Sequence, residues 1–159
     1  MKKNLILLLQ VAIVLIGISS LSILIGLPLT EGRAKNLDLF SIYADPFILY
    51  AYASSIAFFV ALYNAFKLLG YMGQDKLFSL NSIRALKSIK YCAILLSFLI
   101  VGAGIYIRIF HNKDDDPAGF LAICFLTTFV SIAVAIAASI FEKKLQKTID
   151  MKSENDLTF

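Results

Sequence analysis

The sequence predicts an all-α integral membrane protein, a four-helix bundle whose N- and C-termini both lie in the cytoplasm. Hydrophobic residues make up 59% of the 159 residues and charged residues only 16%, whereas soluble domains are about 45–50% apolar and about 25% charged. The apolar residues gather in four runs, each long enough to cross a hydrocarbon core of about 30 Å. Lysine and arginine concentrate on one side of these runs. We expect a single membrane domain over residues 1–159.

The first two spans are expected at residues 5–29 and 47–69. The first run has 25 residues, whereas the apolar region of a secretory signal peptide has about 7–15 and ends in a small-residue cleavage site. We therefore expect the first span to be retained. Asp45 and Pro46 predict the start of the second span, because aspartate is a favoured helix cap and proline a favoured first helical residue.

A basic amphipathic bridge, residues 71–90, is expected between the second span and the third span at 91–110. Its apolar residues recur every three positions: Leu80, Ile83, Leu86 and Ile89. Its basic residues form a separate ridge: Arg84, Lys87 and Lys90. Such a segment is expected to lie along the inner headgroups with its apolar face in the membrane. We also expect it to run directly into the third span.

The fourth span is expected at residues 118–141, after a second start signal at Asp116 and Pro117. Small residues recur along it at spacings of four and three: Cys124, Thr128, Ser131, Ala135 and Ala138. Because small residues allow close helix contacts in lipid, we predict a helix-packing ridge and a central position in the bundle. The tail, 142–159, is predicted to begin as a charged helix and to end in a polar, mobile segment.

The flanking charges predict the orientation, because lysine and arginine near spans stay on the cytoplasmic side. The side with both termini and the bridge carries eleven basic residues: Lys2, Lys3, Lys67, Lys76, Arg84, Lys87, Lys90, Lys143, Lys144, Lys147 and Lys152. The other side carries four: Arg33, Lys35, Arg108 and Lys113. We expect cytoplasmic termini, two short external loops and a cytoplasmic face that attracts anionic lipids.

Among the polar residues of the first two spans, Gln10, Tyr63 and Asn64 are the candidate intramembrane polar site. An amide in hydrocarbon needs a hydrogen-bonding partner, so Gln10 and Asn64 are expected to bond between helices. The alternative is that these side chains line an intramembrane ligand site.

The sequence contains no motif for catalysis. It has no nucleophile–base pair, zinc-protease motif, phosphate loop or carboxylate dyad, and no ionisable residue near a bilayer midplane, which argues against a pump or transporter. Cys92 and Cys124 are expected to be small buried hydrophobes. Asp114–Asp116 beside His111 either form a solvated loop with a helix cap or bind a divalent cation. We expect no enzyme activity, no cofactor and no metal.

Four stretches resemble a known family. They read ALYNAFKLLGYM at 61–72, KLFSLNSIRALKSIKYCAI at 76–94, KDDDPAG at 113–119 and KLQKTIDMKSENDLTF at 144–159. They look like the domain of unknown function 2975 family, which comprises small four-span membrane proteins of bacteria, chiefly Firmicutes. The resemblance covers Ala61–Phe159 well and the first span in hydropathy only. It implies a bacterial cell membrane and brings no established reaction or cofactor. Members often lie beside genes for small helix-turn-helix regulators, which suggests such a regulator as a partner.

Two functions follow as hypotheses. In the first, the protein is a regulatory adaptor whose cytoplasmic face binds a small regulator, without binding nucleic acid directly. The candidate partner-binding residues are Arg84, Lys87, Lys90, Glu154, Asn155, Asp156 and Leu157. In the second, Gln10, Tyr63, Asn64 and the small-residue ridge line a site for a lipid or small molecule, including immunity to a membrane-active peptide. Self-association through the ridge is a further possibility.

Overall fold

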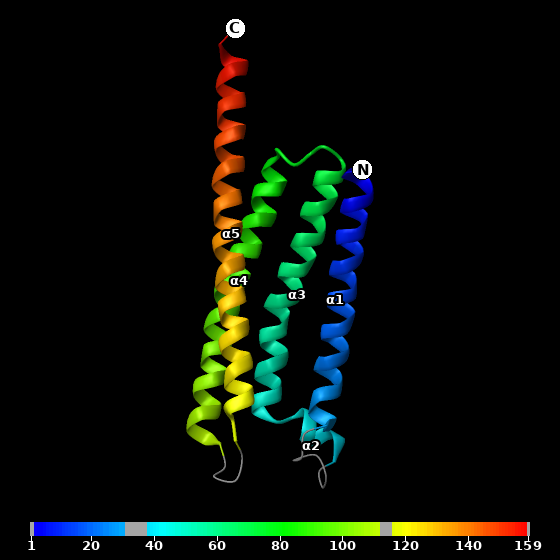
Figure 1. The fold of residues 1–159 in the computed structure, drawn as a ribbon, viewed down its shortest axis with the longest axis vertical. Coiled ribbons are helices and arrows are strands. Elements are labelled where there is room, and N and C mark those ends of the chain that lie inside the picture. The colour runs from blue at the N-terminus through cyan, green and yellow to red at the C-terminus, as the bar shows by residue number, and fades with distance from the viewer. Residues whose placement is uncertain (1, 31–37, 112–115, 159) are drawn as a thin grey trace.

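A computed structural model describes residues 2–30, 38–111 and 116–158 (Figure 1). The chain forms five helices in this part: α1 (Lys2–Thr30), α2 (Leu39–Tyr43), α3 (Pro46–Gly73), α4 (Leu80–Phe110) and α5 (Ala118–Leu157). All except α2 are long and apolar enough to cross a membrane. Large side chains such as Leu8, Phe98 and Phe129 are exposed on them, which suits a hydrocarbon environment. The predicted all-α membrane bundle is confirmed.

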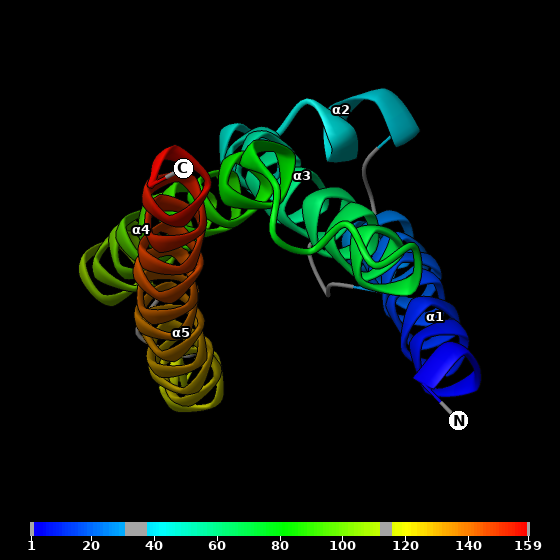
Figure 2. The same ribbon diagram turned by 90° about the horizontal axis from the view of Figure 1, so that it is seen from above.

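The four long helices are arranged as an open row. Helix α1 packs mainly on α3, α3 on α4, and α4 on α5. Seen from above, α4 and α5 lie side by side on one side of α3, and α1 lies on the other side, away from α5 (Figure 2). The predicted central position of the fourth span is therefore wrong. The spacing of its small residues creates one close-packing face, and this face is used by one neighbour, α4.

Along the direction of the helix axes, the bundle has two distinct ends (Figure 1). We call one the terminal end; it holds the start of α1, the α3–α4 connection and the last turns of α5. The other is the loop end, where α1 leads to α2 and α4 leads to α5. Helix α5 reaches past the α3–α4 connection, so its last turns project beyond the other helices.

The helix starts follow the local signals in the sequence. Asp45 accepts a hydrogen bond from the backbone N–H of Phe47 at 2.8 Å, and Pro46 is the first residue of α3. Ser79 caps α4 through the N–H of Ser82. These contacts satisfy backbone donors that have no partner within a helix, and the start predicted at Asp45 and Pro46 is confirmed.

The bridge and the tail differ from expectation. Residues 71–73 end α3, and residues 80–90 are the first turns of α4, which continues without a break to Phe110. Ile83, Leu86 and Ile89 are buried against other helices instead of facing the membrane surface. The polar end of the tail, predicted to be mobile, is helical to Leu157.

Candidate functional site

A hydrophobic cluster of buried residues lies at the terminal end. Its buried members come from α4 and α5: Ile83, Leu86, Ile89, Ala138 and Leu145. Partly buried residues of α3, of the α3–α4 connection and of α5 surround them: Ala65, Leu68, Leu77 and Ile149. We call this set the terminal cluster. It joins three helices and the connection between two of them, so it makes this end a single packed unit.

A buried serine fixes the α3–α4 connection to the terminal cluster. Ser82 is fully buried. Its hydroxyl donates to the backbone carbonyl of Lys76 at 3.3 Å and lies 3.3 Å from the Ser79 hydroxyl. Because a buried hydroxyl without a partner destabilises the fold, this bonding holds the connection in one position at the start of α4.

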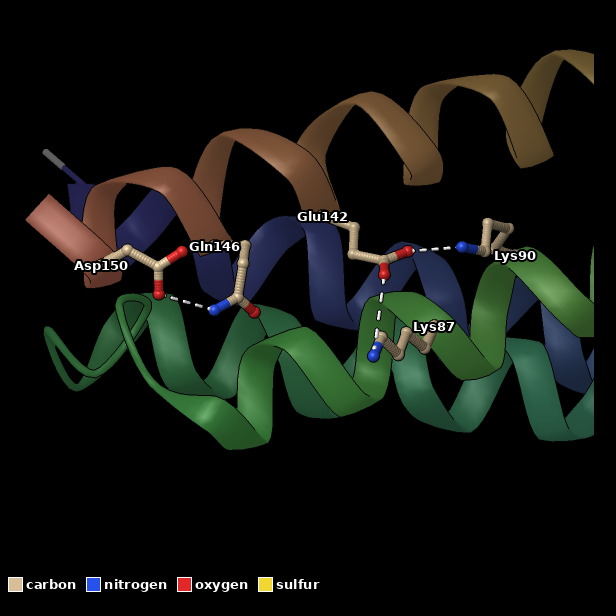
Figure 3. Close-up of polar contacts among 5 residues, drawn as sticks. All are labelled: Lys87, Lys90, Glu142, Gln146 and Asp150. Carbon is tan, nitrogen blue, oxygen red and sulfur yellow. Dashed lines mark hydrogen bonds and ion pairs between the residues drawn. The ribbon is translucent and has the colours of Figure 1, made fainter.

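An ion-pair cluster borders the terminal cluster (Figure 3). Lys90 Nζ of α4 lies 2.7 Å from Glu142 Oε2 of α5, and Lys87 Nζ lies 3.9 Å from Glu142 Oε1. The Glu142 and Lys90 side chains are 14% and 20% exposed, and that of Lys87 is 53% exposed. The shorter contact is therefore a partly desolvated charged hydrogen bond, and the longer one is largely open to solvent.

Glu142 was not singled out from the sequence, although a signal for it exists. It follows Ala138 by four residues and so continues the spacing of the small-residue ridge. A carboxylate at that position lies on the face of α5 that meets α4, opposite the basic ridge of the bridge. Lys87 and Lys90 were predicted to bind a partner. In the structure, both form ion pairs with Glu142 and so link α4 to α5.

A groove runs along α5 from Glu142 to Glu154 and begins beside Lys87 of α4. It has a volume of about 540 Å³ and mixed charge, and it is lined by Lys87, Glu142, Lys143, Gln146, Lys147, Asp150, Met151 and Glu154. Gln146 and Asp150 both line it, and Gln146 Nε2 donates to Asp150 Oδ1 at 2.9 Å (Figure 3). We call it the terminal groove. Apart from Lys87, all of its lining residues come from α5.

Of the other predicted partner-binding residues, one lines this groove and the rest are exposed elsewhere on α4 and α5. Arg84 is exposed in the first turns of α4. Glu154 lines the terminal groove together with Lys87. The remaining three, Asn155, Asp156 and Leu157, are exposed in the last turn of α5 and do not line the groove.

The intramembrane polar residues do not converge on one site. Gln10 Nε2 donates to the Phe66 carbonyl at 3.4 Å and so connects α1 to α3. Asn64 Nδ2 donates to Ser88 Oγ at 3.0 Å and so connects α3 to α4. Tyr63 is exposed, with Lys67 Nζ 5.1 Å from its ring centroid. The two amides thus make the interhelical hydrogen bonds expected of them.

The small-residue ridge faces α4. A Cβ atom placed on Gly104 would lie 3.7 Å from Cys124 Cβ, which is a close approach of the two helices. Farther along, Ala135 and Ala138 are buried, while Thr128 and Ser131 are half-buried.

The acidic loop is only partly described. Asp114 and Asp115 lie outside the described residues. Asp116 accepts a hydrogen bond from the Ala118 N–H at 3.0 Å, but α5 has Pro117 at its N-cap, so Asp116 lies one residue before the capping position predicted for it. Among the residues that the structure describes, no group of three or more His, Cys, Asp or Glu side chains is placed to hold a metal ion.

A family model, described as a protein of unknown function (DUF2975), matches residues 28–159. The chain belongs to this family. It is also similar to the uncharacterized membrane protein YoaS of Bacillus subtilis strain 168, with 40% identity over 152 residues that cover 94% of each chain. No solved structure matches the chain. The family match extends from the last turns of α1 through α5, so it includes the terminal cluster, Glu142 and the terminal groove. It confirms the family resemblance and the assignment as a multi-pass membrane protein.

Proposed function

We propose that the protein is a non-enzymatic membrane adaptor whose terminal end faces the cytoplasm and binds a small soluble regulator. The observation that carries this proposal is the projection of α5 beyond the other helices (Figure 1). Helix α5 continues beyond Glu142 to Leu157, roughly 24 Å at 1.5 Å per residue; its first part packs on α4 through Glu142 and Leu145, and its last turns project. A membrane anchor alone does not need such an extension.

Packing and surface chemistry at this end support a docking role. The terminal cluster holds the base of the extension through Leu145 and Ile149, so the projecting turns have a fixed starting direction. The terminal groove offers cations, carboxylates and the exposed Met151 along one side. Mixed charge favours one orientation of a partner helix, and methionine adapts its shape to an apolar anchor.

The charge distribution supports the cytoplasmic orientation. Eleven of the fifteen basic residues belong to the terminal end by sequence, and such residues near spans favour the cytoplasmic side. A small helix-turn-helix regulator is the partner that the family resemblance favours. The adaptor would hold the regulator at the membrane, and the regulator, not this chain, would contact DNA.

The proposal is tested by crosslinking and pull-down from native membranes through a tag on the N-terminus. We expect the full chain to recover a helix-turn-helix protein, and a chain ending at Lys152 to recover it at about a tenfold lower level, because that chain lacks Glu154 of the terminal groove and the exposed Leu157, and a few residues carry most of the energy of an interface. Leu145 and Ile149 remain in the shorter chain, so the terminal cluster is kept.

Two lysines of α5 provide a matched pair of variants. Lys147 lines the terminal groove, whereas Lys144 is exposed on α5 and does not line it. Lys147→Glu is expected to reduce recovery of the regulator, and Lys144→Glu to leave it unchanged. Equal recovery with all four chains, or recovery of no regulator with any of them, would contradict the adaptor role.

A second candidate function is binding of a lipid or small apolar molecule within the membrane. It is favoured by a groove of about 420 Å³ whose lining comes from all four spans: Ser20, Leu24, Ser54, Ser55, Phe58, Phe59, Leu96, Ile100, Leu126, Thr127, Val130 and Ser131. Of the residues proposed for this function from the sequence, only Ser131 lines it. This function replaces the adaptor role if the pull-down recovers only lipids from the full and the shortened chain.

A further inference from the structure

A separate groove lies between α4 and α5 at the loop end. It has a volume of about 350 Å³ and is lined by Val101, Gly104, Ile105, Arg108, Ile109, Leu121, Cys124, Phe125 and Thr128. It shares no lining residue with the terminal groove or with the groove between the four spans. The lining residues of α4 run from Val101 to Ile109, which is roughly 12 Å along the helix axis.

The groove owes its shape to the small residues where the two helices meet. Gly104 and Cys124 bring α4 and α5 close together. Ile105 and Phe125, beside them, are exposed to the surroundings of the helices. The walls of the groove are therefore mainly apolar side chains, and the groove opens towards the membrane. An apolar groove at membrane depth is filled by hydrocarbon, because water there would find no hydrogen-bonding partners.

Of the residues that the structure describes, Arg108 is the one charged residue that lines this groove. It lies in the last turn of α4, two residues before the helix ends at Phe110, which is the depth at which an arginine side chain reaches the headgroups. The ring of His111 contacts the backbone carbonyl of Arg108 at 3.0 Å, and the Asp116 carboxylate accepts a hydrogen bond from the Ala118 N–H. The guanidinium is a planar donor that fits phosphate oxygens well.

We propose that this groove binds one anionic phospholipid from the leaflet at the loop end. One acyl chain lies along the apolar wall from Ile109 to Val101, and the phosphate is bound by Arg108. Charge favours this occupant: the wall offers hydrocarbon contacts to any lipid, whereas the cation at its mouth favours a headgroup with net negative charge. The site is at the opposite end of the molecule from the proposed adaptor surface and is independent of it.

The test is native mass spectrometry of the purified full chain with phosphatidylglycerol and phosphatidylethanolamine of identical acyl chains. We expect phosphatidylglycerol to be retained preferentially, and Arg108→Gln to reduce this preference about fivefold, which corresponds to about 1 kcal/mol per basic residue near an anionic surface. Lys144→Gln is the control, because Lys144 is an exposed cation at the terminal end that lines neither this groove nor the terminal groove, and ten other basic residues remain at that end. It should keep the preference.

A second variant tests the apolar wall without removing the charge. Val101 lines the groove but is half-exposed, so Val101→Phe should fill the groove without disturbing the α4–α5 contact and should lower retention of phosphatidylglycerol. Glycerol 3-phosphate, the headgroup chemistry without acyl chains, should not compete. The proposal is overturned if Arg108→Gln keeps the wild-type preference, if glycerol 3-phosphate displaces the lipid, or if the wild type is a lipid-free dimer whose second copy covers the groove.

Discussion

Replacing Leu86 with alanine is expected to lower the free energy of unfolding by about 2–5 kcal/mol, the usual range for a leucine lost from a packed core. Leu86 is 4% exposed and belongs to the terminal cluster. Lysine and arginine residues of α4 and α5 lie close in sequence to the residues of this cluster, so this end of the bundle is expected in water or among lipid headgroups. Folding therefore removes Leu86 from a polar environment, and the hydrophobic effect stabilises its burial. Thermal denaturation followed by circular dichroism in detergent micelles measures the effect.

Leu80→Ala provides the control on the same helix. Leu80 is 61% exposed, so its truncation should change the melting temperature little. Hydrogen exchange in the Leu86 variant should increase mainly at the first turns of α4 and at the α3–α4 connection, which depend on the cluster. Equal destabilisation by the two substitutions would mean that the terminal end is not packed as described.

Reversing the charge of Glu142 is expected to have the second largest effect. In Glu142→Lys, three cations would lie together at the α4–α5 contact, and the charged hydrogen bond to Lys90 would be lost. Hydrogen bonds between charged groups are stronger than neutral ones, and like charges at the contact add repulsion. We expect a clear fall in the melting temperature, smaller at high salt because ions screen the repulsion.

A charge swap distinguishes the pair from a general effect of charge. Combining Lys90→Glu with Glu142→Lys restores opposite charges across the contact and should recover most of the lost stability. Asp150→Lys is the control, because Asp150 is exposed on α5 and bonds within its own helix. If the swap is no more stable than Glu142→Lys alone, the Lys90–Glu142 contact does not hold the two helices together.

Features that depend on local sequence were predictable. The spans follow from runs of apolar residues, and the start of α3 follows from an aspartate and a proline. The small-residue ridge of α5 was correctly predicted to be the packing face of this helix, since Ala135 and Ala138 are buried. Each of these is encoded within a few turns of one helix, where spacing and capping chemistry are sufficient.

Features that depend on which helices meet were not predictable. A ridge of small residues predicts one close contact but not the number of neighbours, so the edge position of α5 was missed. An amphipathic segment such as residues 80–90 presents the same pattern whether it rests on lipid or on another helix. The polar composition of Ser153–Leu157 concealed its helical state, because the preceding helix continues into it.

The central claim is that the terminal end, with its projecting helix, faces the cytoplasm. Cysteine labelling in intact cells tests it most directly. Cys92 and Cys124 are first replaced by alanine, and a single cysteine is then introduced as Met151→Cys in the terminal groove or as Gly119→Cys at the loop end. Met151 is exposed, and no atom lies within 4 Å of a Cβ at Gly119, so both positions accept the change.

A maleimide that cannot cross the membrane should label the Gly119 variant in intact cells and the Met151 variant only after the membrane is opened. Labelling of the Met151 variant in intact cells, with the Gly119 variant protected, would place the terminal groove outside the cell and would contradict the adaptor account.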